Sequence, residues 1–398
     1  MQRPIQLKVK SSFVKNYKNG LPLITEDSVQ NHKDLQVEGS IFELVDDQKQ
    51  FIGKGYYGLQ NKGRGWVLSR NRNEVFDYAF FLQKFKQARL HREFLFQDVE
   101  TTAFRLFNGE GDGIGGLIID YFDGFYVISW YSEGIYSFKE SVIQALHEAV
   151  EVKGLYEKKR FASKGTYLED DDFVSGEKAT SPLIVKENGM NFAVYLNDGA
   201  MVGIFLDQRD VRKTIRDSYA KGKTVLNTFS YTGAFSVAAA LGGAEKTTSV
   251  DLANRSKSKT IEQFSVNEID YESQDIIVED VFNYFKYAVR KQLTFDIVIL
   301  DPPSFARSKK HTFSAGKDYP DLLEQAIAIT EQNGIIVASS NCSTFDMKKF
   351  KGFIDKAFKQ TGGGYNILEE FSLPTDFKTI PEFKEGNYLK VVFIKKLT

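Results

Sequence analysis

The stretch that most constrains this chain is residues 295–303, which read Phe-Asp-Ile-Val-Ile-Leu-Asp-Pro-Pro. The apolar, β-branched run before the prolines is typical of a strand buried on both faces of a parallel sheet. Pro302 and Pro303 lack an N–H donor, so the strand is predicted to stop at Asp301. Ligands of open α/β sheets bind at this carboxyl edge. Asp301 is therefore a candidate site residue, and the alternative is an aspartate that only caps the next helix.

The C-terminal part of the chain, residues 186–398, alternates strand-like and helix-like patterns. Expected strands cover residues 192–196, 224–229, 246–252, 274–279, 295–300 and 334–339. Expected helices cover residues 208–219, 233–241, 254–267, 318–332 and 346–360. Strands separated by helices indicate βαβ units and a mostly parallel, Rossmann-like sheet. The last two strand-like runs, 367–373 and 388–396, have no helix between them and predict an antiparallel hairpin at the sheet edge.

The preceding residues are predicted to form two smaller modules. Residues 1–75 contain short strand-like runs broken by glycines, with more basic than acidic residues, and indicate a small β domain. Residues 76–100 have apolar side chains at roughly helical spacing and are expected to form one linker helix. It opens an α+β module that extends to residue 185. Within it, residues 163–181 are polar, and the acidic run 169–172 favours a solvated loop over a metal site.

Composition excludes several classes of protein. The single cysteine rules out an intrachain disulfide framework or a cysteine-based zinc site, and the four histidines show no metal-ligand spacing. No apolar run approaches the roughly 20 residues of a membrane span, and the first residues do not resemble a secretory signal. These features predict a cytoplasmic protein without a metal. With a net charge of −1, a polyanionic partner would have to be held by local basic patches.

Successive predicted strand ends suit a nucleoside that carries an amino-acid group. Residues 227–233 (Asn-Thr-Phe-Ser-Tyr-Thr-Gly) end one strand and open a helix whose free N–H groups suit a carboxylate. Asp251 ends the next strand, where an acid can bind both hydroxyls of a ribose, and Asp280 is placed to meet an adenine amino group. The absence of a G-x-G-x-x-G fingerprint disfavours a dinucleotide. The set predicts S-adenosylmethionine, although each aspartate alone is more often a cap or a surface acid.

Cys342, the only cysteine, lies just after another predicted strand, in the run Ser-Ser-Asn-Cys-Ser of residues 339–343. In a doubly wound sheet this strand end is expected to neighbour Asp301. A thiolate beside a cofactor suits nucleophilic catalysis. The alternative is a buried cysteine that acts as a small hydrophobic side chain.

Several of these motifs together resemble the class I methyltransferases that act on ribosomal RNA, and most closely the RlmI type of large-subunit rRNA cytosine-5 methyltransferase. The motifs are residues 227–236, 249–251, 301–305 and 341–343, with 203–209 (Gly-Ile-Phe-Leu-Asp-Gln-Arg) just before the first core strand. Residues 109–120 resemble the middle module of that family, often called EEHEAD, and residues 1–75 resemble its PUA domain. The resemblance implies a PUA-like domain at 1–75, a linker helix and EEHEAD-like module at 76–185, and a methyltransferase domain at 186–398.

The resemblance also implies a reaction. Cys342 would add to C6 of a cytosine, and the activated C5 would take the methyl group of S-adenosylmethionine. Asp301 would bind the N3/N4 edge of the base, which must be unpaired or flipped out. The base that removes the C5 proton is not identified. The implied cofactor residues are Gln208, Asn227, Phe229, Ser230, Tyr231, Thr232, Gly233, Asp251, Leu252, Asp280, Val281 and Asp301.

The same resemblance implies an RNA partner and a possible homodimer. The candidate RNA-binding residues are Arg64, Arg70, Pro302, Pro303, Arg307, Lys309 and Lys310. Trp66, within the basic stretch of the first domain, is expected in the core rather than stacked on a base.

Ser304 departs from the family pattern, which usually has lysine at this position. Residues 301–310 also resemble rRNA guanine methyltransferases of the RlmK type, which use no covalent cysteine. The alternatives are therefore methylation of a guanine nitrogen with Cys342 as a bystander, methylation of DNA, and a non-catalytic RNA-binding or assembly factor.

Overall fold

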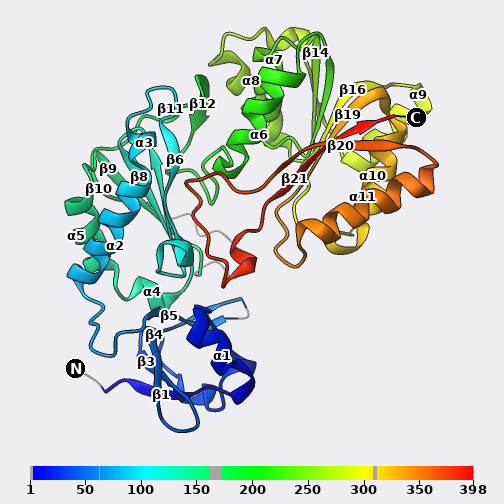
Figure 1. Ribbon diagram of the computed structural model, residues 1–398. Helices are drawn as coiled ribbons and strands as arrows, with labels where there is room; N and C mark the ends of the chain where they lie inside the picture. The colour runs from blue at the N-terminus through cyan, green and yellow to red at the C-terminus, as the bar shows by residue number, and fades with distance from the viewer. Residues whose placement is uncertain (1–2, 62, 162–171, 308–311, 398) are drawn as a thin grey trace. The chain divides into compact units, whose positions relative to one another are not determined.

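The computed structural model describes residues 3–61, 63–161, 172–307 and 312–397, and its contacts divide the chain into two compact units (Figure 1). Unit 1 consists of Met1–Val185, Tyr195–Val202 and Thr375–Gly386, and unit 2 consists of Lys186–Val194, Gly203–Pro374 and Asn387–Thr398. The second and third segments of unit 1 come from the region predicted to form the C-terminal domain. A division of unit 1 near residue 75 remains a prediction.

Unit 1 contains two five-stranded mixed sheets. The first has the strand order β1-β3-β4-β5-β2 and the second the order β10-β9-β8-β7-β6. The strands of the first sheet are β1 (Ile5–Lys8), β2 (Leu23–Thr25), β3 (Ile41–Val45), β4 (Phe51–Gln60) and β5 (Gly63–Ser69). The helices between them are α1 (Ser11–Asn19), η1 (Glu26–Ser28) and η2 (His32–Asp34). The strands of the second sheet are β6 (Ala103–Asn108), β7 (Leu117–Phe122), β8 (Phe125–Trp130), β9 (Gly154–Lys159) and β10 (Phe173–Gly176). The helices of this part of the chain are α2 (Tyr78–His91), α3 (Glu93–Phe96), η3 (Gly109–Asp112), α4 (Glu133–Tyr136) and α5 (Lys139–Ala149).

Two expectations for this unit need correction, and one is confirmed. Strand β10 and the buried Asp172, which forms an ion pair with Lys158, occupy part of the stretch predicted as a solvated loop. Residues 162–171 lie outside the described part of the chain. The helix predicted over 76–100 is interrupted at Arg92, which separates α2 from α3. Trp66 is buried, as expected, with 3% of its surface exposed.

Arg92 interrupts the helix because its side chain has partners that only the folded chain brings together. It is fully buried and donates to the two carboxylate oxygens of Asp112 at 2.9 and 2.7 Å. It also donates to the carbonyls of Arg105 and Asp376, at 3.0 and 3.1 Å from Nε. This network ties the segment Thr375–Gly386 into unit 1.

Replacing Arg92 with methionine is expected to destabilise unit 1 by about 3–5 kcal/mol, because Asp112 would keep a buried charge without its bidentate partner. The measurement is the urea midpoint followed by tryptophan fluorescence. The matched control is Lys86→Met, which removes an exposed ion pair with Glu148 at 3.4 Å and should cost about 1 kcal/mol or less. Equal losses in the two variants would contradict a special role for the buried network.

Unit 2 is built on a seven-stranded sheet of order β15-β14-β13-β16-β19-β21-β20. The first five strands are parallel, and β21 and β20 form the predicted antiparallel edge hairpin. The strands are β13 (Thr224–Thr228), β14 (Lys246–Asp251), β15 (Asp275–Val278), β16 (Phe295–Leu300), β19 (Thr330–Ser340), β20 (Tyr365–Phe371) and β21 (Lys390–Lys396). Two ribbons lie outside this sheet, formed by β11 (Leu183–Glu187) with β12 (Met190–Val194) and by β17 (Phe305–Arg307) with β18 (Thr312–Ser314). The strand predicted at 192–196 therefore belongs to a separate hairpin.

Helices cover both faces of the sheet, which explains the apolar run in β16. Ile297 and Ile299 pack in one hydrophobic core with α6 and α7, whereas Val298 and Leu300 pack in the other with α9, α10 and α11. The alternation follows from the two-residue period of a strand. The helices are η4 (Leu206–Gln208), α6 (Arg209–Thr214), the π-helical η5 (Ile215–Tyr219), α7 (Ala234–Leu241), α8 (Asn254–Ser265), η6 (Tyr271–Ser273), α9 (Val281–Lys291), α10 (Ala315–Ala328), α11 (Met347–Thr361) and η7 (Lys384–Gly386), the last in unit 1.

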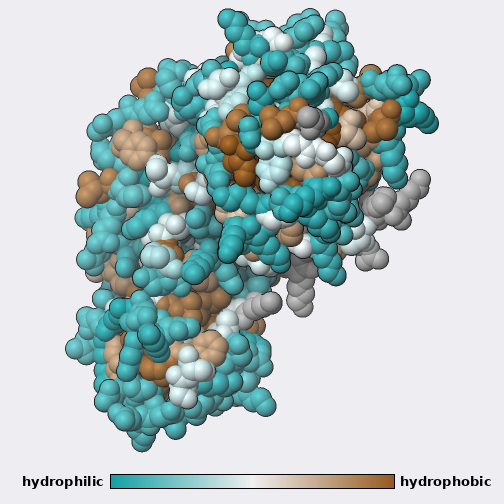
Figure 2. All heavy atoms as spheres, turned by 45° about the vertical axis from the view of Figure 1, so that its right-hand side comes forward, coloured by the Kyte–Doolittle hydropathy of each residue, from teal (hydrophilic) through white to brown (hydrophobic). Residues whose placement is uncertain are grey.

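The surface is mostly hydrophilic in the view of Figure 2, with hydrophobic residues in separate patches. Leu90 and Val99 in unit 1 and Phe305 in unit 2 are among the most exposed large apolar side chains. Within the described residues, no helix is both long enough and apolar enough to span a membrane.

Candidate active site

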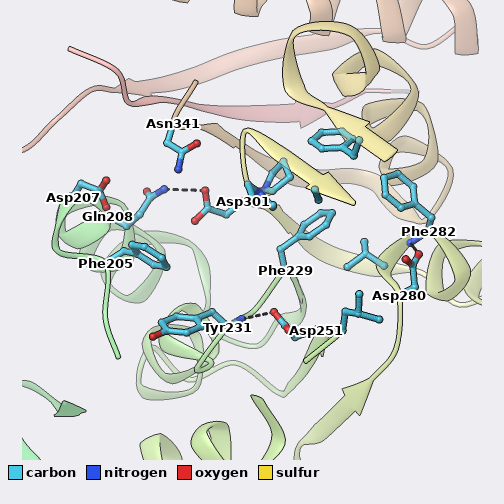
Figure 3. Close-up of a pocket in the computed structure, with 16 residues that line it drawn as sticks. Phe205, Asp207, Gln208, Phe229, Tyr231, Asp251, Asp280, Phe282, Asp301 and Asn341 are labelled. Carbon is cyan, nitrogen blue, oxygen red and sulfur yellow. Dashed lines mark hydrogen bonds between the residues drawn. The ribbon is translucent and has the colours of Figure 1, made fainter. Parts of the chain in front are cut away.

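A cavity of about 360 Å³ lies in unit 2, lined by residues from the carboxyl ends of the parallel strands. This volume is within the range of small-molecule sites, roughly 300–1,000 Å³. The lining residues are Phe205, Asp207, Gln208, Phe229, Tyr231, Asp251, Leu252, Asp280, Val281, Phe282, Asp301, Pro302, Pro303, Ala306, Phe313 and Asn341 (Figure 3). The strand-end position predicted for Asp301 is confirmed.

The loop after β13 forms one wall of the cavity. Phe229 and Tyr231 have φ angles of 53° and 52°, and Gly233 has a φ of 82°. Positive φ angles are unusual for bulky residues, and such backbone orients successive N–H groups toward a common point. A Cβ atom at Gly233 would lie 2.6 Å from Cγ2 of Thr260, so only glycine fits here.

Asp251 holds this loop in place. One of its carboxylate oxygens accepts a hydrogen bond from the amide of Tyr231 at 2.8 Å (Figure 3). The other accepts one from the amide of Ala253, also at 2.8 Å. Each oxygen retains a second lone pair. Asp251 can therefore fix the loop and accept hydrogen bonds from a pair of hydroxyl groups at the same time.

Four residues of the predicted cofactor motif are not part of the lining, namely Asn227, Ser230, Thr232 and Gly233. Asn227 is fully buried and donates to Oγ of Ser236 at 3.0 Å. Thr232 donates to the carbonyl of Gly203 at 2.8 Å. These side chains form hydrogen bonds within the protein, which the sequence motif could not distinguish from direct contact with a ligand.

One side of the cavity is apolar. The rings of Phe229 and Phe313 lie 6.4 and 6.0 Å from the ring of Phe282, centroid to centroid. Leu252 is 57% exposed and lines the same cavity. Apolar side chains of this kind can contact the faces of a purine ring. Asp280 also lines the cavity, and it caps α9 by accepting a hydrogen bond from the amide of Phe282 at 2.9 Å. Asp280 is therefore both a helix cap and a candidate site residue.

The other side is polar and centred on Asp301. Its Oδ1 accepts a hydrogen bond from Nε2 of Gln208 at 3.1 Å (Figure 3). It accepts another from Oγ of Ser339 at 2.7 Å. Burial raises the pKa of Asp301 from its usual 3.8 to about 6, and the nearby charge of Asp207 acts in the same direction. At neutral pH the carboxylate is therefore ionised but close to titration.

Cys342 is adjacent in sequence to the cavity-lining Asn341 but is not itself part of the lining. Its residue surface is 9% exposed, and it belongs to the hydrophobic core cluster that also contains Phe345 and Phe350. Its Sγ lies 3.1 Å from Oγ1 of Thr344.

The predicted RNA-binding residues are spread over both units. Arg64 forms an ion pair with Glu26 at 2.6 Å in unit 1, where Arg70 is exposed. Pro302 and Pro303 line the cavity. Arg307 is the last residue of β17, and Lys309 and Lys310 lie outside the described residues.

Sequence reasoning missed six lining residues, which are Phe205, Asp207, Phe282, Ala306, Phe313 and Asn341. Phe205 and Asp207 belong to the 203–209 motif, and Asn341 precedes the cysteine, so nearness to recognised motifs could have identified them. Ala306 and Phe313 pair across the β17–β18 ribbon. No sequence signal indicated that this ribbon lines the cavity.

Comparisons with known proteins agree with this arrangement. A family model for S-adenosylmethionine-dependent methyltransferases matches residues 112–357, and a model for PUA-like domains matches residues 7–70. The chain is 62% identical over 98% of its length to the "Putative ribosomal RNA large subunit methyltransferase YwbD" of Bacillus subtilis, covering 99% of that protein. It is 30% identical over 93% of its length to ribosomal RNA large subunit methyltransferase I of Yersinia pseudotuberculosis, covering 93% of that protein.

Two solved structures are similar over nearly the whole chain. One is SMU.776, described as a putative methyltransferase complexed with SAH, with 40% identity, a TM-score of 0.91, and coverage of 98% of this chain and 100% of that one. The other is a putative SAM-dependent methyltransferase from Streptococcus mutans, with 39% identity, a TM-score of 0.90 and the same coverage. The fold, the cavity and these matches lead to one conclusion: the chain belongs to the S-adenosylmethionine-dependent methyltransferase family and carries an N-terminal PUA-like domain.

Proposed function

We propose that this enzyme methylates a base of large-subunit ribosomal RNA. The relatives with 62% and 30% identity are both named as methyltransferases of that RNA, and they align over more than nine-tenths of this chain. The PUA-like domain supports a structured RNA as the substrate, since a free nucleotide needs no second binding domain. The exposed Arg70 is a candidate phosphate contact there.

The cavity suits S-adenosylmethionine. Asp251 is proposed to bind the ribose, and the apolar residues around Phe282 the adenine, with Asp280 at its amino group. The cavity is lined by four aspartates, which favours a cationic sulfonium and ammonium over neutral groups. Gln208 supports the fit, because within the described residues its buried Oε1 has no hydrogen-bond partner and is available to a ligand donor. When bound, the cofactor supplies an electrophilic methyl group.

For the target base, the geometry favours a guanine nitrogen over C5 of cytosine. Both donors that reach Asp301 bind Oδ1, and hydrogen bonds of this kind stabilise an ionised carboxylate. An ionised acceptor matches the N1–H and N2–H donors of guanine, whereas N3 of cytosine is itself an acceptor. The observation that carries the proposal is that this acceptor lines the cavity, whereas Cys342 is only 9% exposed and is not part of the lining.

A second candidate, cytosine-5 methylation through Cys342, is favoured by one contact. The ammonium of Lys390 donates to the carbonyl of Cys342 at 2.8 Å, and a nearby cation stabilises a thiolate. In this candidate the thiol, which is not part of the cavity lining, would have to become accessible from the cavity before it could attack C6.

The variant Cys342→Ala separates the two candidates. For transfer to a guanine nitrogen, we expect methylation within about threefold of the wild type and a stability loss of about 1 kcal/mol for the small cavity. The measurement is methyl transfer to rRNA from a deletion strain, followed by mass spectrometry of the nucleosides. A fall of about 10³-fold or more, with 5-methylcytidine as the wild-type product, would establish the covalent candidate instead.

The control for that experiment is Cys342→Ser, which keeps a small polar side chain. Under the guanine proposal both variants retain activity and the product is a methylguanosine. Absence of any methylated nucleoside with the wild-type enzyme, on either free rRNA or assembled subunits, would refute the rRNA assignment.

A further inference from the structure

The ends of β16 and β19 lie side by side at the polar side of the cavity. Their register pairs Leu300 with Ala338, which brings the following residues, Asp301 and Ser339, next to each other. Beyond Asp301 the two prolines offer no N–H to continue the ladder. The carbonyl of Ser339 is buried with its residue and therefore needs a donor from elsewhere.

Tyr319, on α10, supplies that donor. Its buried hydroxyl donates to the carbonyl of Ser339 at 2.6 Å and lies 3.5 Å from the carbonyl of Leu300. Burial raises the pKa of Tyr319 well above its ordinary value, so the hydroxyl keeps its proton. One hydroxyl thus bridges the two strand ends and fixes the distance between them.

The side chain of Ser339 connects the strand end to the acid. Its Oγ donates to Oδ1 of Asp301 at 2.7 Å and accepts from Nε2 of Gln208 at 2.8 Å. Because Gln208 also donates to Oδ1, the three side chains form a closed triangle. Among the described residues Oδ2 of Asp301 has no hydrogen-bond partner, so it is the oxygen available to a ligand.

We propose that Ser339 and Tyr319 are positioning residues for methyl transfer, which orient Oδ2 of Asp301 toward the target base and keep this carboxylate an acceptor. Ser339 is fully buried and outside the cavity lining, so it acts through Asp301 rather than on the substrate. Tyr319 acts one step further away, by holding the Ser339 backbone. The identity of the base donors rests on the proposed function, whereas the orientation of the carboxylate does not.

The variant Ser339→Ala tests the proposal. At saturating RNA and cofactor, kcat should fall about 10- to 100-fold, because the acid is no longer held in one orientation. The KM for RNA and the Kd for S-adenosylmethionine should stay within about threefold. Ser339→Thr, which restores a hydroxyl, should recover most of the loss, and Tyr319→Phe should lower kcat in the same sense but less.

The matched control is Ser340→Ala. Ser340 is the next residue of β19 and is also buried, and its hydroxyl accepts a backbone hydrogen bond from Cys342 at 3.3 Å. It should keep wild-type kcat. An Ser339→Ala enzyme that matches this control in kcat would overturn the proposal, as would equal loss in both variants with equal loss of melting temperature.

A second measurement needs no RNA. In protein labelled with ¹³C at the aspartate carboxyl carbons, the Asp301 signal can be assigned with Asp301→Asn and followed by titration. In Ser339→Ala, which lacks the hydroxyl donor, the titration midpoint of Asp301 should move upward by about one pH unit. The charged groups that act on Asp301, Asp207 and Arg212, are unchanged in the variant, as is the neutral Tyr319.

These readouts separate the inference from the rRNA assignment. An unmoved midpoint in Ser339→Ala would refute the positioning role even if the wild type methylates rRNA. A moved midpoint in an enzyme that methylates no rRNA would support the positioning role and refute only the proposed substrate.

Discussion

Replacing Asp301 with asparagine is expected to lower kcat/KM for RNA by at least about 10²-fold at saturating cofactor. Asparagine keeps the size of the side chain and one oxygen for the donors of Ser339 and Gln208. The other carboxylate oxygen becomes an NH₂ group, which would face the N–H groups of the target base. Two donors facing each other in a dry site leave both unpaired.

The measurement is transfer of a labelled methyl group to rRNA from a deletion strain, with the cofactor saturating because Asp301 also lines its cavity. Asp321→Asn makes the same chemical change at an exposed position on α10 and should leave the rate unchanged. Asp301→Asn activity within threefold of this control would show that the carboxylate takes no part in base recognition.

The pH dependence of the wild type gives the same prediction a second readout. Burial raises the pKa of Asp301 to about 6. As the pH falls through this value the carboxylate gains a proton and ceases to be an acceptor, so kcat/KM should fall about tenfold for each further pH unit. Asp301→Asn should lack this acid limb. A wild-type profile that stays flat down to pH 5 would contradict the assignment.

Replacing Asp251 with alanine is expected to weaken binding of S-adenosylmethionine by at least about 100-fold. The carboxylate holds the amides of Tyr231 and Ala253, and it is the proposed ribose acceptor. Hydrogen bonds to a charged group contribute about 1.5–3 kcal/mol each, so losing two such interactions accounts for this factor. Without the hydrogen bonds from the amides of Tyr231 and Ala253, the positive φ angles at Phe229 and Tyr231 are no longer held in place.

Isothermal titration calorimetry with S-adenosylmethionine measures this loss directly. The control is Asp275→Ala, which removes a half-exposed carboxylate at the opposite end of the neighbouring strand β15, where it pairs with Lys246 at 2.9 Å. The control should bind the cofactor as the wild type does. If Asp251→Ala binds within threefold of the control, the ribose must be held by other residues.

The sequence predicted the strand-end aspartates of the candidate site better than it predicted the ligand-facing residues of the loop after β13. Asp251, Asp280 and Asp301 were predicted to lie at successive strand ends, and all three line the cavity. Asn227 and Thr232 belong to the same motif, yet neither lines the cavity, and their side chains donate to Ser236 and to the carbonyl of Gly203. A motif gives the order of residues along a loop, whereas the φ angles of that loop decide which side chains face the ligand.

The linker helix shows a similar limit. Its apolar spacing predicted a single helix, but Arg92 interrupts it. The partners responsible are Asp112 and Asp376, and the second is 284 residues away. No local pattern contains a contact of that range.

By itself, the sequence determined the parallel sheet, its edge hairpin and the carboxylates at its rim, because strand period, prolines and helix alternation are local properties of the chain. Only the tertiary structure decided which side chains of that rim act together. Ser339 meets Asp301 because two strands pair in one register, and Cys342 packs in the core because of the path its backbone takes after β19. Both depend on residues distant in sequence, whose relative positions are fixed only when the helices close over the sheet.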